Sequence, residues 1–381
     1  MTMRRSAMFV MPLVLATAMA AVVAGCINPE PIQPLLGSFA PTGSMTYPRA
    51  AFAMAPLPGG KVLASGGDSG SVLFSQVISS AEIYDPTAGT WSLAPSMNAA
   101  RVWPAAVVLA DGRVLVIGGY DASQTSLVSA EIYDPVNNVW TPTGDLNAAR
   151  GRAQAVLLAD GRVLVTGGEA TYGVPALSSA EIWTPATGLW TLTGSMTTAR
   201  DSFQAVLLQG GKVMACGGYG AAPIGSSEIF DPSAGAWTAA ASMNTARDDL
   251  TATVMAGGLV MAAGGADATG LAVTAAELFS PVTGAWTPAA PLMTAREEHV
   301  AVLMGSGRVL VAGGQDGRGN PISAAELYDA AAGAWLQASN MTTARQLAGI
   351  VLLASGQALV AGGRTITGAP QALSTAEIYT P

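Results

Sequence analysis

Short apolar runs, separated by turns rich in glycine, proline and aspartate, make up almost all of the chain after residue 35. In residues 153–168, AQAVLLADGRVLVTGG, two runs rich in Val and Leu flank Asp160 and Gly161. An Asp-Gly pair suits the positive φ angles of a two-residue hairpin. Two further runs, SAEIW and LWTLT, follow after turns that contain glycine or proline. The pattern predicts four short antiparallel strands in this stretch.

The same unit recurs seven times along the chain, with spacings of 47 to 52 residues. Each unit has a glycine pair, which begins at Gly66, Gly118, Gly167, Gly217, Gly264, Gly313 and Gly362. A Glu-Ile or Glu-Leu pair and an aromatic residue follow, starting at Glu82, Glu131, Glu181, Glu228, Glu277, Glu326 and Glu377. Six units end in a tryptophan, at Trp91, Trp140, Trp190, Trp237, Trp286 and Trp335. Seven units of four strands predict an all-β, seven-bladed β-propeller, whose radial arrangement leaves only short strand edges exposed.

The run LLGSFAPTGSM at residues 35–45 matches only the end of a unit, such as GLWTLTGSM at residues 188–196. The seventh unit lacks this fourth strand, because the sequence stops at Pro381. We therefore expect the segment around Phe39 to pair with the strand around Ile378 as the outer strand of the last blade. This pairing would close the ring.

The glycine pair, the Glu-hydrophobe-aromatic strand and the following Trp resemble the kelch repeat. The resemblance covers residues 35–381 and implies the propeller fold. Kelch units commonly carry a His a few residues after an Arg, and only His299 occupies that place here. Phe52, Pro104, Ala153, Phe203, Leu250 and Ala348 stand there in the other units. The resemblance therefore implies the fold but transfers no functional site.

The N-terminus reads as a secretory signal, with basic Arg4 and Arg5 followed by an apolar run up to Ala24. Its end, Val-Ala-Gly-Cys at residues 23–26, resembles the bacterial lipobox, which implies a lipid on Cys26. An uncleaved membrane helix and an ordinary signal peptide are the alternatives. We expect a signal peptide at residues 1–25, a tether at 26–34 and a propeller at 35–381. All of these alternatives place the propeller outside the cytoplasm, and the lipobox places it in a bacterial cell envelope, anchored to the outer membrane or cell surface.

Composition narrows the class of partner. Loss of Arg4 and Arg5 with the signal peptide would leave 15 basic residues against 25 acidic ones, a net charge of −10. This balance excludes a nucleic-acid partner. Apart from Cys26, the chain has one cysteine, Cys216, which precedes a glycine pair where other units have small residues such as Ala. We expect it to be a buried core residue rather than a reactive thiol.

Two charged positions recur in all units and are expected to build the blades by pairing with each other. One is the glutamate of the third strand. The other is an arginine before the first strand, at Arg49, Arg101, Arg150, Arg200, Arg247, Arg296 and Arg345.

Strand parity places the loops between the second and third strands on the same face as the loops between blades. Ten acids are expected on this loop face: Asp68, Asp121, Glu169, Asp201, Asp248, Asp249, Asp267, Glu297, Glu298 and Asp316. Outside the repeated arginines, only Arg152, Arg318 and Arg364 oppose them there, whereas the opposite face is nearly neutral. Binding residues are commonly carried by loops on a rigid scaffold, so the acidic face is the candidate functional face.

The candidate ligand-binding residues are those of the densest acidic stretch and its neighbours: Trp103, Arg152, Asp201, Phe203, Asp248, Asp249, Glu297, Glu298 and His299. An alternative is that these acids are ordinary solvated loop charges that favour solubility. Since adjacent strand residues point to opposite sides, at most alternate members of a run such as Glu297, Glu298 and His299 were expected to converge.

The resemblance leaves both binding and catalysis open, because kelch propellers include galactose oxidase, a copper radical enzyme, and a sialic acid mutarotase. The oxidase chemistry needs two histidines, two tyrosines and a cysteine joined to one of them, and this chain has one histidine. Neither metal-ligand spacing nor a phosphate loop occurs, so no catalytic residue, metal or cofactor is predicted. The preferred interpretation is a lipid-anchored module that binds a protein or glycan through the acidic face. The alternative is a mutarotase-like or lyase-like carbohydrate-active enzyme, with its site in the centre of the same face.

Overall fold

The computed structural model describes residues 36–366 and 371–381. The predicted signal peptide, the tether and Cys26 lie outside the described residues. Among the described residues, the structure has no helix that is both long and apolar enough to cross a membrane.

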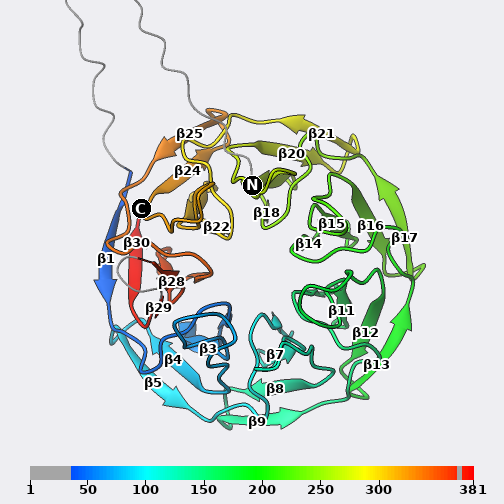
Figure 1. Cartoon of the computed structure of the whole chain (residues 1–381), viewed down its shortest axis with the longest axis vertical. Helices are drawn as coiled ribbons and strands as arrows, with labels where there is room; N and C mark the ends of the chain where they lie inside the picture. Colours follow the sequence, from blue (N-terminus) through cyan, green and yellow to red (C-terminus); the bar gives the residue numbers. More distant parts are fainter. Residues whose placement is uncertain (1–35, 367–370) are drawn as a thin grey trace, which may run out of the picture. The chain divides into compact units, whose positions relative to one another are not determined.

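Seven four-stranded antiparallel sheets form a ring around a central channel, as the repeats predict (Figure 1). The first blade contains β2 (Ala53–Pro56), β3 (Val62–Ser65), β4 (Ala81–Asp85) and β5 (Thr90–Ala94), with a short 3-10 turn, η1 (Pro58–Gly60), in its first hairpin. The second contains β6 (Ala105–Val108), β7 (Val114–Ile117), β8 (Ala130–Asp134) and β9 (Val139–Pro142). The third contains β10 (Gln154–Leu157), β11 (Val163–Thr166), β12 (Ala180–Thr184) and β13 (Leu189–Thr193).

The remaining blades repeat this order. The fourth contains β14 (Gln204–Leu207), β15 (Val213–Cys216), β16 (Ser227–Asp231) and β17 (Ala236–Ala240). The fifth contains β18 (Thr251–Val254), β19 (Val260–Ala263), β20 (Ala276–Ser280) and β21 (Ala285–Pro288). The sixth contains β22 (Val300–Leu303), β23 (Val309–Ala312), β24 (Ala325–Asp329) and β25 (Ala334–Gln337). The seventh contains β26 (Gly349–Leu352), β27 (Ala358–Ala361), β30 (Ala376–Thr380) and β1 (Ser38–Thr42), and carries a small hairpin of β28 (Arg364–Thr365) and β29 (Gln371–Ala372).

Burial varies with the position of a strand in its blade. Each first strand contacts the first strands of both neighbouring blades, so these seven strands surround the channel. The second strands, such as β11, are buried at every position, which explains their near-continuous Val and Leu sequence. Outer strands such as β13 are mostly exposed, although Trp190 is buried. Cys216, at the end of β15, is fully buried, as predicted.

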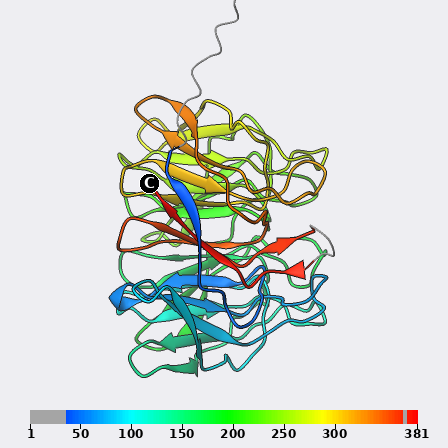
Figure 2. The ribbon, with the colours of Figure 1, turned by 90° about the vertical axis from the view of Figure 1, so that its left-hand side faces the viewer.

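The two ends of the described chain close the ring, which confirms the prediction that the segment around Phe39 completes the last blade. β1 pairs with β30 in antiparallel register, and Phe39 lies opposite Tyr379 while Ala40 lies opposite Ile378. Figure 2 shows β1 in blue crossing beside the red C-terminal strand. The Phe39 amide also donates to Ser339 Oγ at 2.9 Å, which ties β1 to the sixth blade.

The repeated arginines and glutamates pair within each blade, as expected. All seven Nη2–Oε1 distances lie between 2.7 and 3.0 Å, and both side chains of every pair are buried. In the third blade, Arg150 also donates to the carbonyls of Gly167 and Ser179, while Glu181 accepts the amides of Asn147 and Ala148. Each glutamate therefore fastens the loop between blades to the third strand, and removal of one partner of a buried pair costs roughly 3–5 kcal/mol.

The glycine pairs recur because the backbone passes too close to a neighbouring blade for a side chain. At Gly167, with φ +64°, a Cβ would lie 2.5 Å from the Arg200 carbonyl oxygen. The carbonyl of the same glycine accepts the Arg150 hydrogen bond at 2.9 Å. The pair thus joins adjacent blades, and it is not part of a nucleotide-binding loop.

The charges of the face opposite the loop face are paired locally. Lys61 binds Asp85, Arg113 binds Asp111, Arg162 binds Asp160, Lys212 binds Asp231 and Arg308 binds Asp329, at 2.6 to 3.3 Å. This confirms that the opposite face has little unbalanced charge.

Candidate functional site in the central channel

The loop face brings the two expected sets of loops together. A bridge joins the residue after each repeated arginine to the residue after each glycine pair, for example Gly151 to Glu169 and Asp201 to Tyr219. These bridges connect the backbone segments that surround the entrance to the channel. They place the chain between blades directly beside the long loops that connect second and third strands.

One residue from every blade projects at the channel, two positions after the repeated arginine. These seven residues are Ala51, Trp103, Arg152, Ser202, Asp249, Glu298 and Leu347, which we call the channel ring. All seven have positive φ angles of 47 to 54°. Such angles are uncommon outside glycine and are typical of positions held by the surrounding structure. The turn occurs just before the first strand, so the side chain is directed at the channel and not along the sheet.

Backbone hydrogen bonds connect the channel ring and stabilise this conformation. Six of the seven links are present, for example from the Trp103 amide to the Ala51 carbonyl at 2.8 Å and from the Glu298 amide to the Asp249 carbonyl at 3.1 Å. The scaffold therefore fixes seven positions whose side chains differ from blade to blade. Such positions can set ligand specificity without altering the fold.

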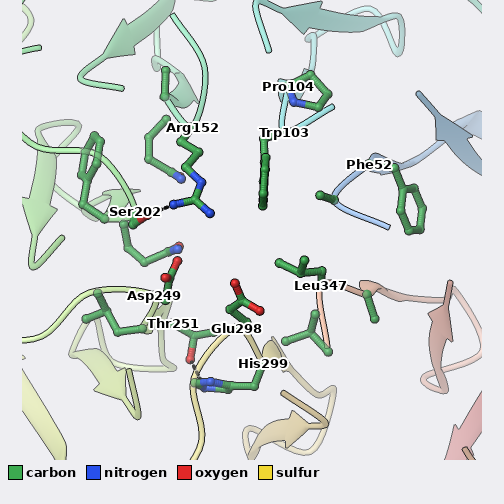
Figure 3. A pocket seen from close by; sticks show the side chains of 18 residues that line it. Phe52, Trp103, Pro104, Arg152, Ser202, Asp249, Thr251, Glu298, His299 and Leu347 are labelled. Atoms are coloured by element: carbon green, nitrogen blue, oxygen red, sulfur yellow. Dashed lines mark hydrogen bonds between the residues drawn. The ribbon is translucent and has the colours of Figure 1, made fainter. Parts of the chain in front are cut away.

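The channel ring and the residues just after it line a cavity of about 350 Å³. Figure 3 shows that the Arg152 guanidinium and the carboxylates of Asp249 and Glu298 point toward its centre. Trp103 stands beside them, and Leu347 contributes an apolar wall. Five successive blades, the second to the sixth, thus bring an aromatic ring, a cation, a hydroxyl and two carboxylates to one cavity.

Arg152 organises the aromatic side of the cavity. Its Nη1 donates to Ser202 Oγ at 3.0 Å, and its Cζ lies 4.2 Å from the Trp103 ring centroid and 5.5 Å from that of Tyr172. A guanidinium over a ring face at this distance is a cation–π contact. Burial disfavours the charge of Arg152, but nearby Asp249, Tyr172 and Glu298 outweigh it and raise the pKa.

Four aromatic rings from three blades form a cluster on the aromatic side of the cavity. Phe74, Trp103, Tyr120 and Tyr172 have ring centroids 5.0 to 6.2 Å apart, and Trp103 and Tyr172 are nearly parallel. The Tyr120 hydroxyl donates to the buried Glu169 carboxylate, and burial raises the pKa of Tyr120. Tyr172 remains exposed and is available to a ligand.

Five carboxylates cluster on the acidic side, where Asp249 and Glu298 line the central cavity. Burial raises the pKa of Asp201 to about 6, of Asp248 to about 7, of Glu297 to about 7 and of Glu298 to about 8, and it also raises the pKa of Asp249. Asp249 is the common neighbour, because its charge raises the pKa of the other four. None of the five is fully exposed: Asp201 is buried and the other four are partly buried.

A second cavity of about 630 Å³ lies next to the first on the same face. It shares Arg152 and Ser202 with the central cavity and is also lined by Tyr172, Asp201 and Asp248. Asp248 and its neighbour Asp249 line different cavities, since Asp249 belongs to the channel ring. Adjacent acids thus diverge, as strand parity suggested, although their charges still act on each other.

Two of the predicted site residues, Phe203 and His299, line the central cavity from its buried wall. Phe203 is fully buried and packs against Met196 and Ala215. His299 is also buried; its Nε2 lies 2.9 Å from Thr251 Oγ1, and burial lowers its pKa well below the usual value. Trp103, Arg152, Asp249 and Glu298 line the same central cavity, whereas Asp201 and Asp248 line the adjoining one.

Four other acids of the predicted loop face lie apart from the cluster. Asp121, Asp267 and Asp316 accept hydrogen bonds from the amides of their own turns. Asp68 is buried against Arg364, with an Nη1–Oδ1 distance of 3.7 Å. The clustered acids thus come from the segments that lead into the fourth, fifth and sixth blades.

Sequence reasoning missed Ser202, Tyr172 and Phe74. Ser202 could have been found from its place two positions after Arg200, which is the place of Trp103 and Asp249 in their units. Tyr172 and Phe74 occupy loops without a repeated pattern, so no such signal marks them.

The donor set does not fit copper oxidase chemistry. The only histidine is held in the wall by Thr251, and Cys216 is buried in β15. Across residues 36–366 and 371–381, no group of three or more His, Cys, Asp or Glu side chains is arranged to hold a metal ion.

Comparisons with known proteins agree with the repeat. The kelch motif matches residues 55–98 and 104–147, which span most of the first two blades. No curated protein matches the chain. A solved structure described as a novel fungal alcohol oxidase with catalytic diversity among the AA5 family, in complex with copper, has a TM-score of 0.73. It is 19% identical, and the alignment covers 91% of this chain and 76% of that one, so this likeness shows the fold alone.

The motif matches, the seven recurring units and the ring of blades define the class: the chain is a kelch-repeat β-propeller. Kelch propellers commonly act as interaction modules, and the fold by itself assigns no chemistry.

Proposed function

We propose that this kelch propeller is a binding module for a glycan, which it holds at the channel ring. The observation that supports this is the convergence of Trp103, Arg152, Ser202, Asp249 and Glu298 in one cavity of about 350 Å³. A concave site with a few convergent polar groups suits a small ligand, whereas a protein partner generally needs a wider surface.

The chemistry of the lining matches that of a sugar. Sugar hydroxyls can donate to the carboxylates of Asp249 and Glu298 and accept from Arg152. Aromatic rings such as Tyr172 offer an apolar face for the C–H side of a pyranose ring. The adjoining cavity of about 630 Å³ gives room for further sugar units.

A glycan array followed by calorimetry with the full chain tests this proposal. Trp103→Ala should weaken binding of any glycan found by roughly 10-fold or more, as expected for a central aromatic contact. Asp160→Asn, on the opposite face, is the matched control and should bind like the parent protein. Equal losses in both variants, or the absence of any glycan ligand, would contradict a site at the channel ring.

Catalysis on a bound carbohydrate is the second candidate, because Asp248 and Glu297 have pKa values raised to about 7. Carboxyl groups that titrate near neutral pH are suited to general acid and base roles. Incubation of the bound glycan with the protein, followed by mass spectrometry, would reveal hydrolysis or elimination, and NMR would reveal anomer exchange. Turnover that persists in Glu297→Gln and Asp248→Asn would exclude these residues from the reaction.

We further propose that the module works outside the cytoplasm on a lipid anchor at Cys26. The support is the sequence of residues 1–26, with its basic start, apolar run and lipobox-like end. Cys26→Ser should abolish incorporation of labelled lipid and release the protein from membranes. A variant that stays in the membrane fraction with its first 25 residues intact would instead indicate a membrane helix.

A further inference from the structure

We infer that the bound glycan carries an unacetylated, protonated amino group and that Asp249 and Glu298 hold this group in the central cavity. The inference rests on the proposed glycan site and names the class of sugar. An amino sugar differs from a neutral one by a positive charge and by three N–H donors on one atom.

The geometry provides two carboxylates side by side at the channel. Asp249 and Glu298 are neighbours in the channel ring, joined by the backbone hydrogen bond of 3.1 Å between blades five and six. Both line the central cavity, and Figure 3 shows their carboxylates directed toward its centre. A single ammonium group placed there can contact both.

Two buried oxygens of the acidic cluster have no hydrogen-bond donor. Glu298 Oε2 is one, and Asp248 Oδ1 is the other. Glu298 lines the central cavity and Asp248 lines the adjoining one, and both side chains are only partly exposed. A buried acceptor without a partner costs free energy, more so when it is charged, so a ligand that brings donors gains from this site.

The charge balance favours a cation over a neutral ligand. Of the five clustered carboxylates, Arg152 lowers the pKa of Asp201, Asp249 and Glu298, and Arg364 acts on Glu298 alone. Arg152 is already engaged with Ser202 and Trp103, and Arg364 with Asp68. The five acids of the cluster thus outnumber the two arginines that act on them. An ammonium offsets this excess, whereas a neutral sugar does not.

The test uses two probes with one backbone: a β-1,4-linked glucosamine oligomer and its fully N-acetylated counterpart. At pH 7 the amino oligomer should bind the full chain at least about 10-fold more tightly, since one charge-assisted contact contributes about that factor. Glu298→Gln should remove the preference. Asp160→Asn changes the net charge equally, on the opposite face, and should retain it.

Proton linkage gives a second readout. A cation between the carboxylates lowers their pKa values, so binding of the amino oligomer at a pH below the pKa of the free amine, where the ligand takes up no further proton, should release protons to the buffer. Calorimetry in two buffers with different ionisation enthalpies measures this release, and Glu298→Gln should reduce it. A merely attractive negative surface would bind the oligomer without this dependence on Glu298.

The outcomes separate the inference from the proposed function. Equal or tighter binding of the acetylated oligomer, or of neutral glycans only, overturns the amino-group inference and leaves the glycan site standing. A preference that survives in Glu298→Gln also overturns it. Binding of pentalysine with the same dependence on Glu298, without binding of the amino oligomer, would replace the glycan with a basic protein segment. If no glycan binds at all, both proposals fail.

Discussion

Phe39 and Tyr379, from the two ends of the described chain, face each other across β1 and β30 with ring centroids 5.1 Å apart. The Tyr379 hydroxyl donates to the Leu36 carbonyl at 2.9 Å. Five other blades make the same contact within a single unit, between a Tyr or Phe of the third strand and the Trp of the fourth, at 5.1 to 5.3 Å. The closing blade therefore uses the common packing, assembled from distant segments.

Phe39→Ala should lower stability by about 2 kcal/mol, because it removes a partly buried aromatic ring from this blade. Phe39→Trp should retain or raise the melting temperature, since it restores the residue of the other blades. Deletion of residues 36–43 should have the largest effect, because it exposes the edge of β30. Thermal unfolding by circular dichroism measures all three, and an unchanged melting temperature after the deletion would show that closure by β1 is dispensable.

A second prediction concerns the buried arginine–glutamate pairs. Arg150→Met should reduce the free energy of unfolding by roughly 3 kcal/mol or more, because it leaves Glu181 buried without its charged partner. Arg113→Met is the control, since Arg113 and its partner Asp111 are well exposed and such pairs contribute little. Urea titration compares the two, and similar losses would contradict the structural role of the repeated pair.

The fold could be predicted from the sequence because it repeats. Every glycine pair and every Arg–Glu pair is an independent copy of the same structural pattern, so each copy supports the same prediction. The segment around Phe39 fits only the seventh unit, which lacks its fourth strand. The acids of the site were also recognised, as departures from the repeat at positions such as Asp249 and Glu298.

The site itself could be predicted only in part, because its shape depends on tertiary structure. The turn that directs Ser202 and Asp249 toward the channel requires a positive φ at these residues. A glycine would have indicated such a turn in the sequence, but neither position is a glycine. Tyr172 reaches Trp103 from a loop of the next blade, with no pattern to announce the contact. His299 and Phe203, chosen as distinctive residues, lie in the buried wall of the cavity, and their contacts there depend on the tertiary structure.

A third prediction tests the role of Arg152 inside the acidic cluster. Arg152→Gln removes a charge that lowers the pKa of Asp249 and Glu298. Both carboxyls should then hold their protons to higher pH, and the variant should lose more stability at pH 8 than at pH 5.5. Arg318→Gln, in an exposed turn, should change stability equally at the two pH values. A loss that is independent of pH would indicate that Arg152 acts by packing alone.

The last prediction is that the parent protein becomes less stable as pH rises from about 4.5 to 8. The pKa values of Asp201, Asp248, Glu297 and Glu298 are raised to about 6, 7, 7 and 8 in the folded state. Unfolded carboxyls titrate near pH 4, so across this window the folded protein binds more protons at these four carboxyls than the unfolded chain, and this outweighs the single proton that buried His299 loses on folding. Stability must then fall with rising pH.

Acids with lowered pKa values, such as Asp160 and Glu181, act in the opposite direction but below this window, where their stabilising contribution is lost as pH falls. Glu298→Gln and Asp248→Asn should therefore raise the melting temperature at pH 8, have little effect at pH 4.5 and flatten the slope between. Asp160→Asn should leave the slope unchanged. Melting curves at half-unit pH steps measure this, and a parent protein that gains stability toward pH 8 would show that these carboxylates are compensated in a way that the channel geometry does not provide.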